Sequence, residues 1–470
     1  MSYNGARAQI SYGYHPLIDH QPLTGGGFSG GNITGLSGLT NLKYVDEEMW
    51  ILSGTNAGQV YHVVTNGTTS ITVQESTSGL AATDRVCFTS RHQRPTTTSL
   101  HLASDYDQEL PDAKHTLMQK HYHGQGVEPV QTFVLKSEYP GKGIKSDLIH
   151  PFLLLGILGG EYGSGTDVGG GGGSTVSGAH YAGDVTLNAA DATNYGVGDW
   201  IQVGTGASPP ATGTKECREI TAKSVNALTL DWPLSYAHAD GETLNEVAAP
   251  FTNLIVAAKA RPPWICLEAV YDEATDFVRH WLGGHLGSVE IEGSSDGSVM
   301  LTLSDCQWLD QQNNATSGST VTVIATQPYQ WSHVSGGITL NSVVYASLES
   351  WKLTINRPVK TAYFHSSTYS TKPSAAFWES LDYDFECVVV PQNTNFATLL
   401  ADKTEFNVSL NYIRTAASDE ITIAFTNMTL EEAGHPLPRV GEVRTTLKGK
   451  FENLTVTAID SYGHHYLQNT

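Results

Sequence analysis

Residues 277–310 contain the feature that most constrains how this chain can fold. Two runs, 288–292 and 299–304, alternate apolar and polar side chains, and the segment 293–297 between them is rich in glycine and serine. Successive side chains of a strand point to opposite faces of a sheet, so such alternation is typical of a strand with one buried face. The two runs therefore predict an antiparallel hairpin that packs one face on a core and turns the other toward water.

The same alternation recurs in the C-terminal half of the chain, at 351–355, 385–389, 421–425 and 447–456. We therefore predict a mainly β protein with a central antiparallel β-sandwich or barrel. Short helices are expected at 112–122, 272–281 and 395–402, each packing on a sheet face.

Two further stretches indicate small inserted β modules. Residues 44–92 place two strand-like runs on either side of Asn66-Gly67, and residues 177–248 follow a similar plan of strands, an asparagine-containing turn and an aspartate-led strand. We interpret the two modules as related through duplication. Five consecutive glycines at 169–173 predict a flexible linker before the second module.

The modules divide the remaining chain into three parts. Residues 1–43, rich in glycine, serine and aromatic residues, predict an extended arm that needs a partner surface to become ordered. Residues 93–176 predict the first part of the core together with the glycine linker, and residues 249–470 predict the main core. The second module is then an insertion that decorates an older domain.

The composition argues against several classes of function. The formal net charge is −21 and the pI is near 5.2, so a general affinity for nucleic-acid phosphates is not expected. An acidic wall lets DNA pass without holding it, and an acidic surface also keeps a protein soluble; both interpretations stay open. The five cysteines are scattered without a CxxC pair, which predicts reduced, buried residues and neither a disulfide framework nor a thiolate metal site.

Export and membrane segments are not expected. The sequence begins without a basic region followed by an apolar run, and its longest apolar run, 151–158, is too short to span a bilayer. We expect a soluble protein that is made in the cytoplasm of a cell and has no membrane partner.

No motif predicts catalysis. The sequence has no nucleophile elbow and no phosphate-cradling loop. His121 and His123, or the pair His464-His465, could ligate a metal, but no further ligand stands at a known zinc spacing. We therefore predict no catalytic, cofactor-binding or metal-binding residue, and no cofactor.

Carboxylate pairs keep one enzymatic alternative open. Pairs that could serve as glycosidase acids are Glu47-Glu48, Glu431-Glu432 and Glu290/Glu292. The tryptophans in apolar patterns are more typical of core or interface anchors: Trp264, Trp281, Trp308 and Trp351. Glu290 and Glu292 lie on the polar face of one strand, where they form an ordinary solvated face or line a negative channel.

Several segments around the hairpin carry a family resemblance. They are 250–253 (PFTN), 264–272 (WICLEAVYD), 277–289 (FVRHWLGGHLGSV), 347–357 (SLESWKLTINR), 382–390 and 419–427. Together they resemble the tail tube protein family of long-tailed double-stranded DNA viruses of bacteria and archaea. The resemblance covers mainly residues 250–460 and rests on strand patterns more than on single residues. The two small modules depart from the minimal family pattern and are similar to the surface decorations of larger tube proteins.

The resemblance implies a structural, non-enzymatic protein of a virion tail, made in the host cytoplasm. Its subunits would polymerise as stacked rings, usually hexameric, into a hollow conduit for genome delivery. Implied partners are further copies of the chain, the baseplate and terminator proteins of the tail, and double-stranded DNA that passes without specific binding.

The same resemblance gives individual residues a place in the tube. Glu290, Glu292 and Thr302 are expected to face the lumen, while the N-terminal arm and the loop 311–318 are candidates for contacts between rings. Lys448 and Lys450 are expected to meet acidic neighbours in the protein, not DNA.

Two other functions stay open on the sequence alone. One is a different β-rich virion protein, such as a tail terminator or a glycan-binding adhesin, and the other is a glycan-active enzyme. A tube subunit predicts spontaneous polymerisation, and an adhesin predicts affinity for sugars. An enzyme predicts clustered acids whose replacement abolishes activity without changing assembly.

Overall fold

The fold is mainly β, as predicted, and nearly all of its strand pairs are antiparallel. The computed structural model describes residues 9–15, 18–24, 28–56, 59–91, 99–101, 110–120, 131–141, 143–168, 173–181, 184–204, 215–231, 234, 236–257, 262–272, 277–295, 297–314, 321–322, 327–345, 347–363, 372–373, 375–390, 396–416, 418–434 and 444–461.

One sheet of the core is built on the predicted hairpin. β22 (Ser288–Ser294) and β23 (Met300–Ser304) pair antiparallel, with Glu290 opposite Thr302. The sheet continues on both sides in the order β12 (Ile144–Asp147), β23, β22, β29 (Leu348–Asn356), β32 (Asp382–Val389) and β35 (Thr445–Lys450).

A second sheet packs against the first. Its order is β13 (Gly159–Asp167), β19 (Thr243–Ala257), β36 (Asn453–Asp460), β34 (Asp419–Gly434), β33 (Phe406–Thr415), β27 (Val334–Leu340) and β28 (Val343–Tyr345). The long strand β34 pairs with β33 and β36 along its first part and with β35 along its last residues. It therefore joins the two sheets of a sandwich.

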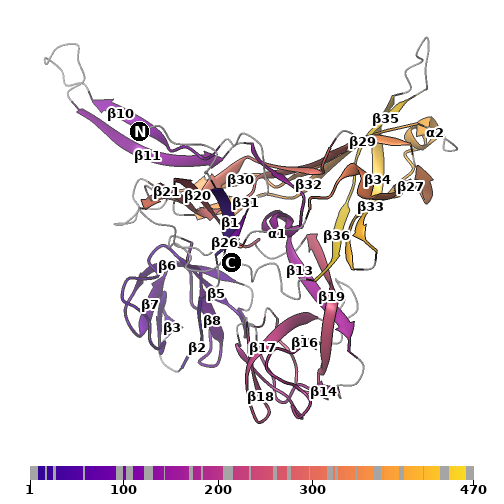
Figure 1. Cartoon of the computed structure of the whole chain (residues 1–470). Helices are drawn as coiled ribbons and strands as arrows, with labels where there is room; N and C mark the ends of the chain where they lie inside the picture. The colour runs from indigo at the N-terminus through magenta and orange to yellow at the C-terminus, as the bar shows by residue number, and fades with distance from the viewer. Residues whose placement is uncertain are drawn as a thin grey trace, which may run out of the picture.

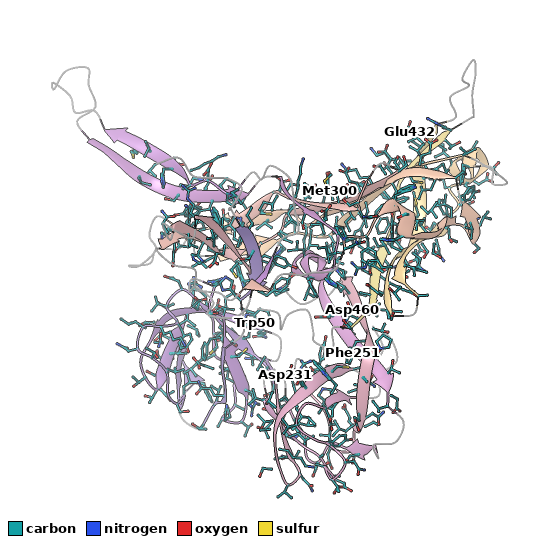
Figure 2. All side chains as sticks on the ribbon, viewed as in Figure 1. Trp50, Asp231, Phe251, Met300, Glu432 and Asp460 are labelled. Carbon is teal, nitrogen blue, oxygen red and sulfur yellow. The ribbon has the colours of Figure 1, made fainter. Side chains whose placement is uncertain are left out.

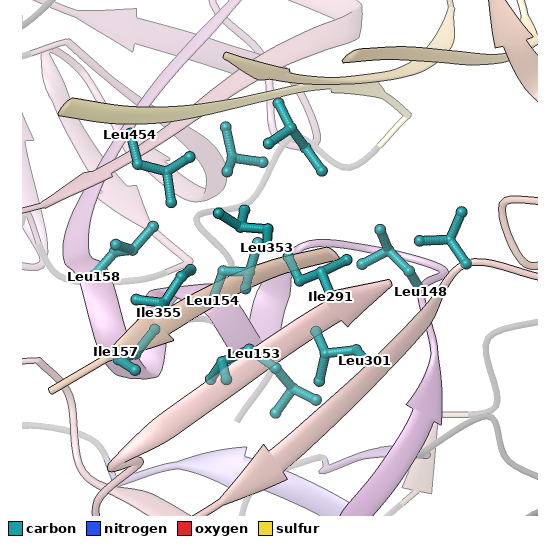
Figure 3. Packing of buried hydrophobic residues seen from close by; sticks show 14 of the residues in the cluster. Leu148, Leu153, Leu154, Ile157, Leu158, Ile291, Leu301, Leu353, Ile355 and Leu454 are labelled. Atoms are coloured by element: carbon teal, nitrogen blue, oxygen red, sulfur yellow. The ribbon is translucent and has the colours of Figure 1, made fainter. Parts of the chain in front are cut away.

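The apolar run at 151–158 supplies a buried helix to this core. All seven residues of α1 (Phe152–Leu158) are buried, and the helix ends at the left-handed Gly159. Figure 3 shows its side chains among Ile291 and Leu353 of the first sheet and Leu454 of the second. Each such side chain stabilises the fold by about 1.5–3 kcal/mol. In the part of the chain that the structure describes, no helix is long and apolar enough to cross a membrane.

The helix predicted at 112–122 was wrong, because these residues contain a strand. β10 (Lys114–Lys120) pairs antiparallel with β11 (Gln131–Gly141), which continues onto β24 (Cys306–Trp308). Pairing with a partner strand distant in sequence satisfies the backbone and overrides the weak local helical pattern.

The helix predicted at 272–281 was also wrong. β20 (Ile265–Asp272) ends where that segment begins, and β21 (Phe277–Gly284) occupies its second half. The third predicted helix, at 395–402, is confirmed by α2 (Phe396–Ala401).

β20 and β21 belong to a six-stranded sheet that also contains β1, from the predicted N-terminal arm. Its order is β25 (Asp310–Asn314), β21, β20, β1 (Gln9–Tyr14), β9 (Ser99–His101) and β26 (Val321–Thr322). Tyr14 also donates a hydrogen bond to the carbonyl of Phe152 in α1. For this part of the predicted arm, the partner surface is therefore supplied by the same chain.

A module near the N-terminus forms its own seven-stranded sheet. Its strands are β2 (Ile18–Pro22), β8 (Arg85–Phe88), β5 (Glu48–Ile51), β6 (Val60–Asn66), β7 (Ser70–Val73), β4 (Asn32–Thr34) and β3 (Phe28–Ser29). They enclose a separate apolar cluster that includes Leu23, Ile33 and Phe88. We call this body module 1.

A second module, module 2, is carried by the first half of β19. Its other strands are β14 (Ser174–Thr175), β15 (Thr186–Asn188), β16 (Trp200–Val203), β17 (Glu216–Ser224) and β18 (Ala227–Leu230). They enclose another apolar cluster, around Leu187, Ile220 and Leu244. The remaining elements are β30 (Val359–Ala362), β31 (Ala375–Trp378) and the short helix η2 (Trp331–His333).

Figure 1 shows the two modules on one side of the molecule and the sandwich with the β10–β11 hairpin on the other. In Figure 2, Met300 and Glu432 accordingly lie on the side away from Trp50 of module 1 and Asp231 of module 2. The molecule thus presents two opposed surfaces, one made by the modules and one by the sandwich.

Candidate assembly surfaces

The first sheet of the sandwich turns one face away from the core, and we call it the polar face. Along each strand, buried apolar residues alternate with half-buried or exposed ones. The residues of the polar face are Lys145, Asp147, Glu290, Glu292, Met300, Thr302, Lys352, Thr354, Asp384, Glu386, Lys448 and Lys450. Because the strands pair in register, these side chains form rows that run across the sheet.

One row alternates in charge across five strands. Glu292 lies opposite Lys352, and Lys352 lies opposite Glu386. Lys448 then lies between Glu386 and Glu432. Opposite charges on neighbouring strands attract each other, so the row stabilises this register and leaves little net charge along it.

The three predicted lumen-facing residues all lie on the polar face. Glu290 lies opposite Thr302 and Thr354, and Glu292 is one step further along the same strand. The Glu290 carboxylate is 2.9 Å from the ammonium of Lys352, with side chains 34% and 42% exposed. At such exposure an ion pair contributes at most about 1 kcal/mol. Sequence reasoning found the two carboxylates but not the lysine that partly neutralises them.

Lys450 meets acidic neighbours, as expected from the sequence. Its ammonium lies 2.7 Å from Asp382 and 3.3 Å from Asp384. The hydrogen bond to Asp382 is the main cause that raises the pKa of Lys450 above its ordinary value. Lys352 and Lys450 are thus engaged by carboxylates of the same sheet, which limits what these two lysines offer to a phosphate backbone.

A groove of about 500 Å³ lies at the turn end of the polar face. Its lining includes Glu292, Lys352 and Glu386 of the charged row, together with Met300 and Gly293. Trp351 also lines the groove, and its indole donates a hydrogen bond to the Tyr412 hydroxyl, 2.6 Å away. The groove therefore combines charged side chains with a substantial apolar surface.

The second surface is the β10–β11 hairpin, which Figure 1 shows extending away from the sandwich. Its exposed apolar side chains are Leu117 (57%), Leu135 (49%), Met118 (39%) and Val134 (39%). Leu117 lies directly opposite Val134, while Met118, the next residue along β10, points to the other face. Exposed apolar side chains thus occupy both faces of a two-stranded ribbon, which is marginally stable on its own.

The sequence pattern did not indicate this hairpin. The pattern of β10 was interpreted as a helix, although valine, phenylalanine and threonine in 131–134 favour a strand. The N-terminal arm, 1–43, and the loop 311–318 are the predicted contacts instead. The arm supplies β1 to the six-stranded sheet and β2, β3 and β4 to module 1. The first residues of the loop form part of β25, and 315–318 lie outside the described residues.

The other candidate sites have structural explanations. Arg91 is fully buried and its guanidinium is 2.9 Å from Glu48, while Glu47 accepts a hydrogen bond from Thr89 at 2.8 Å. This carboxylate pair therefore holds a buried arginine. All five cysteines are buried, and burial raises the pKa of Cys217 to about 12.

The structure also bears on the histidines considered as metal ligands and on the tryptophans expected in the core. The four histidines considered as possible metal ligands, at 121, 123, 464 and 465, lie outside the described residues. Within the described part, no three side chains are grouped in a way that could hold a metal ion. Trp264, Trp281, Trp308 and Trp351 are each at most 2% exposed, as expected of core anchors.

Comparison with known proteins adds one match. A family model described as phage tail tube protein matches residues 144–458, from the start of β12 into β36, with module 2 inside. This is more than half of the chain. No curated protein matches the chain.

Proposed function

The chain belongs to the phage tail tube protein family, and from this premise we propose that it polymerises as stacked, hexameric rings that form the hollow conduit for genome delivery. It is a structural component of a virion tail. The proposal includes no catalytic step and no cofactor.

The observation that carries the proposal is the pairing of a polar, charge-alternating sheet face with a buried core behind it. A channel wall must stay wet on one side and be rigid on the other. We propose that the polar face lines the lumen, with Glu290, Glu292 and Thr302 exposed to it. The modules, on the opposite side of the molecule, then point outward from the tube (Figure 1).

The charge of the polar face suits passage of DNA. Glu290, Glu292 and Asp384 repel phosphates, and Lys450 and Lys352 are engaged by carboxylates within 3 Å. A wall of this kind neutralises few phosphates, so it displaces few counterions from DNA and offers little affinity for it. Double-stranded DNA is thus a transient occupant in this proposal, and further copies of the chain, the baseplate and the terminator are the lasting partners.

The hairpin supplies contacts between subunits in the proposal. Apolar side chains on both faces of a projecting ribbon are covered only when the ribbon inserts between other surfaces. In a homopolymer every subunit has further copies of the same chain as neighbours, so a second copy is the partner that we propose. The hairpin therefore joins neighbouring subunits or neighbouring rings.

The test of assembly is negative-stain electron microscopy of the purified protein across a concentration series. We expect hollow rings or tubes of uniform diameter. A protein that stays monomeric or trimeric at high concentration contradicts the proposal and favours the adhesin alternative, which a glycan screen would then address.

The contribution of the hairpin is tested with the double variant Leu117→Ser and Val134→Ser. Removing the apolar pair should abolish tubes or raise the concentration needed for them at least tenfold, because the contact loses about 1.4 kcal/mol or more. The measurement is the pelletable fraction against protein concentration.

A matched control removes equally exposed apolar side chains elsewhere. Val197→Ser and Val225→Ser alter residues that are 65% and 84% exposed on module 2. This variant should assemble like the wild type. If the hairpin variant also assembles normally, the hairpin is not an assembly contact, whereas the ring proposal is tested separately by the micrographs of the wild type.

A further inference from the structure

Apart from β3, which has no counterpart among the described strands of module 2, the two modules have the same strand pairing. β5 pairs with β6 and β8 in module 1, just as β16 pairs with β17 and β19 in module 2. In the same way, β7 pairs with β6 and β4 in module 1, and β18 pairs with β17 and β15 in module 2. Finally, β2 pairs with β8 as β14 pairs with β19.

The correspondence extends to single hydrogen bonds. The Asp46 amide donates to the Val63 carbonyl at 2.9 Å, and the Gly198 amide donates to Ile220 at 2.8 Å. Asp46 and Gly198 both have positive φ, at 65° and 93°. A chain that repeats both the pairing and a left-handed residue at the same place has repeated one structural unit.

A register shift also recurs at the same point. β6 shifts between Val63 and Thr65 against β7, and β17 shifts between Ile220 and Ala222 against β18. Bulges are specific features of a strand pair, so their coincidence supports the duplication expected from the sequence.

One arginine crosses from module 1 to module 2. Arg85, at the start of β8, forms an ion pair with Asp184, which precedes β15, and its guanidinium lies 5.8 Å from the ring centre of Tyr181. The two side chains of the ion pair are only 22% and 15% exposed. The modules otherwise keep separate sheets and separate apolar clusters.

The receiving carboxylate is fixed by its own module. Asp184 accepts the Tyr181 amide at 3.0 Å and lies 3.3 Å from Nδ1 of His180. Nε2 of His180 accepts the Asn188 amide at 3.0 Å, so Nδ1 carries the proton and donates it to Asp184. Burial alone would raise the pKa of Asp184, but these hydrogen bonds and the charge of Arg85 hold it below its ordinary value.

We propose that the two modules are copies of one unit and that Arg85, docked on Asp184 and Tyr181, locks them into a single rigid body. The partner of the Tyr181–Asp184 surface is thus the chain's own first module. This interaction is independent of how the subunits form rings.

The interaction is asymmetric, because module 1 supplies only the arginine and module 2 supplies only the aspartate. Arg85 and Thr243 occupy equivalent positions, since their carbonyls accept the amides of Leu52 and Gly204. Asp184 stands two residues before Thr186, which is equivalent to Asn32, so its counterpart in module 1 is Gly30. A contact of this kind closes inside one chain and does not propagate to a third module.

The test measures the distance between the modules. Cysteines introduced at the exposed positions Thr68 and Ser224 carry spin labels, while the native cysteines are all buried. Labelled chains are diluted into excess unlabelled chain so that only distances within one molecule are recorded. We expect one narrow distance in the otherwise unaltered chain and a loss of that narrow distance in Arg85→Ala.

Further variants distinguish loss of the Arg85–Asp184 ion pair from a general destabilisation of module 1. Asp184→Asn preserves the shape of the side chain, so it remains informative if Arg85→Ala does not fold, and it should also broaden the distribution. The double variant Arg85→Ala with Asp184→Asn should be no broader than either single one, because both remove the same interaction. Lys43→Ala breaks another ion pair of module 1, 3.1 Å to Asp19, and should leave the distance unchanged.

Two outcomes would overturn the proposal. One is an unchanged narrow distance in both Arg85→Ala and Asp184→Asn. The other is equal broadening in Lys43→Ala, which would mean that the distance reports the general integrity of module 1.

Discussion

His238 is held between two carboxylates at the root of module 2. Its Nε2 lies 2.7 Å from Glu216, and its Nδ1 lies 2.8 Å from Glu242. Glu216 also pairs with Arg218, and Glu216, Arg218 and His238 are at most 1% exposed. Since both ring nitrogens face acceptors, both carry protons and the imidazole is charged.

The pKa of His238 predicts a pH dependence of stability. Burial alone would lower this pKa, but the hydrogen bonds and charges of Glu216 and Glu242 raise it above its ordinary value. A raised folded-state pKa stabilises the fold fully below the unfolded pKa of about 6.5, and this stabilisation is lost as pH rises through the folded pKa. We expect the free energy of unfolding to fall in that window by up to about 1.4 kcal/mol per pH unit.

The variant His238→Gln isolates this contribution in urea unfolding curves recorded from pH 6 upward. It should be less stable than the wild type near pH 6, and the difference should shrink as pH rises. Glu242→Gln removes one of the two carboxylates and should show an intermediate slope. Parallel curves for the wild type and His238→Gln would show that His238 does not titrate with folding.

At the level of strands, Gly449 of β35 lies opposite β34 with no room for a side chain. A Cβ at this position would lie 2.3 Å from the carbonyl oxygen of Thr429, a backbone atom that cannot swing aside. Gly449→Ala should therefore destabilise the sandwich by about 1–3 kcal/mol. The measurement is the midpoint of urea unfolding.

Gly297 offers the matched control for this substitution. A Cβ there would meet no heavy atom within 4 Å. Gly297→Ala should change stability by no more than about 0.5 kcal/mol. Equal effects at the two positions would mean that chain entropy, not the contact with Thr429, sets the cost.

The elements also show where sequence reasoning succeeds and where it does not. The β22–β23 hairpin was predictable because alternation, turn residues and partner strand lie within one short segment. β10 was not, because its partner β11 follows only after residues 121–130 and its exposed apolar side chains mimic one face of a helix. In β21, Val278, His280, Trp281 and Leu282 are all buried, so the pattern has no period of two to read.

The candidate site divides in the same way. Glu290, Glu292 and Thr302 could be placed on one face because that face is set by strand geometry alone. Lys352, which pairs with Glu290, could not be identified, since the register between β22 and β29 is fixed by contacts distant in sequence. The correspondence of the modules was visible only as a weak pattern, because copies can keep hydrogen bonds while changing side chains.

For the molecule as a whole, the net charge of −21 opposes close packing of many copies. Salt shortens the range of this repulsion from about 30 Å at 0.01 M to about 8 Å at 0.15 M. We therefore expect the critical concentration for assembly to fall over that range, as measured by light scattering. The variant Leu117→Ser with Val134→Ser keeps the same net charge, so wherever it assembles its critical concentration should fall with salt in the same direction. A critical concentration that rises with salt would show that attractive ion pairs between subunits dominate instead.

β19 has a mechanical consequence for this molecule. It is one continuous strand of 15 residues, whose first half lies in module 2 and whose second half pairs with β13 and β36 in the sandwich. A pull on module 2 along this strand loads the backbone hydrogen bonds on both of its edges at the same time, in shear. A strand loaded in shear resists until many of its backbone hydrogen bonds break together. A strand pulled away from one end loses these hydrogen bonds one by one. A force applied to module 2 is therefore transmitted through β19 to both of its neighbours in the sandwich, β13 and β36.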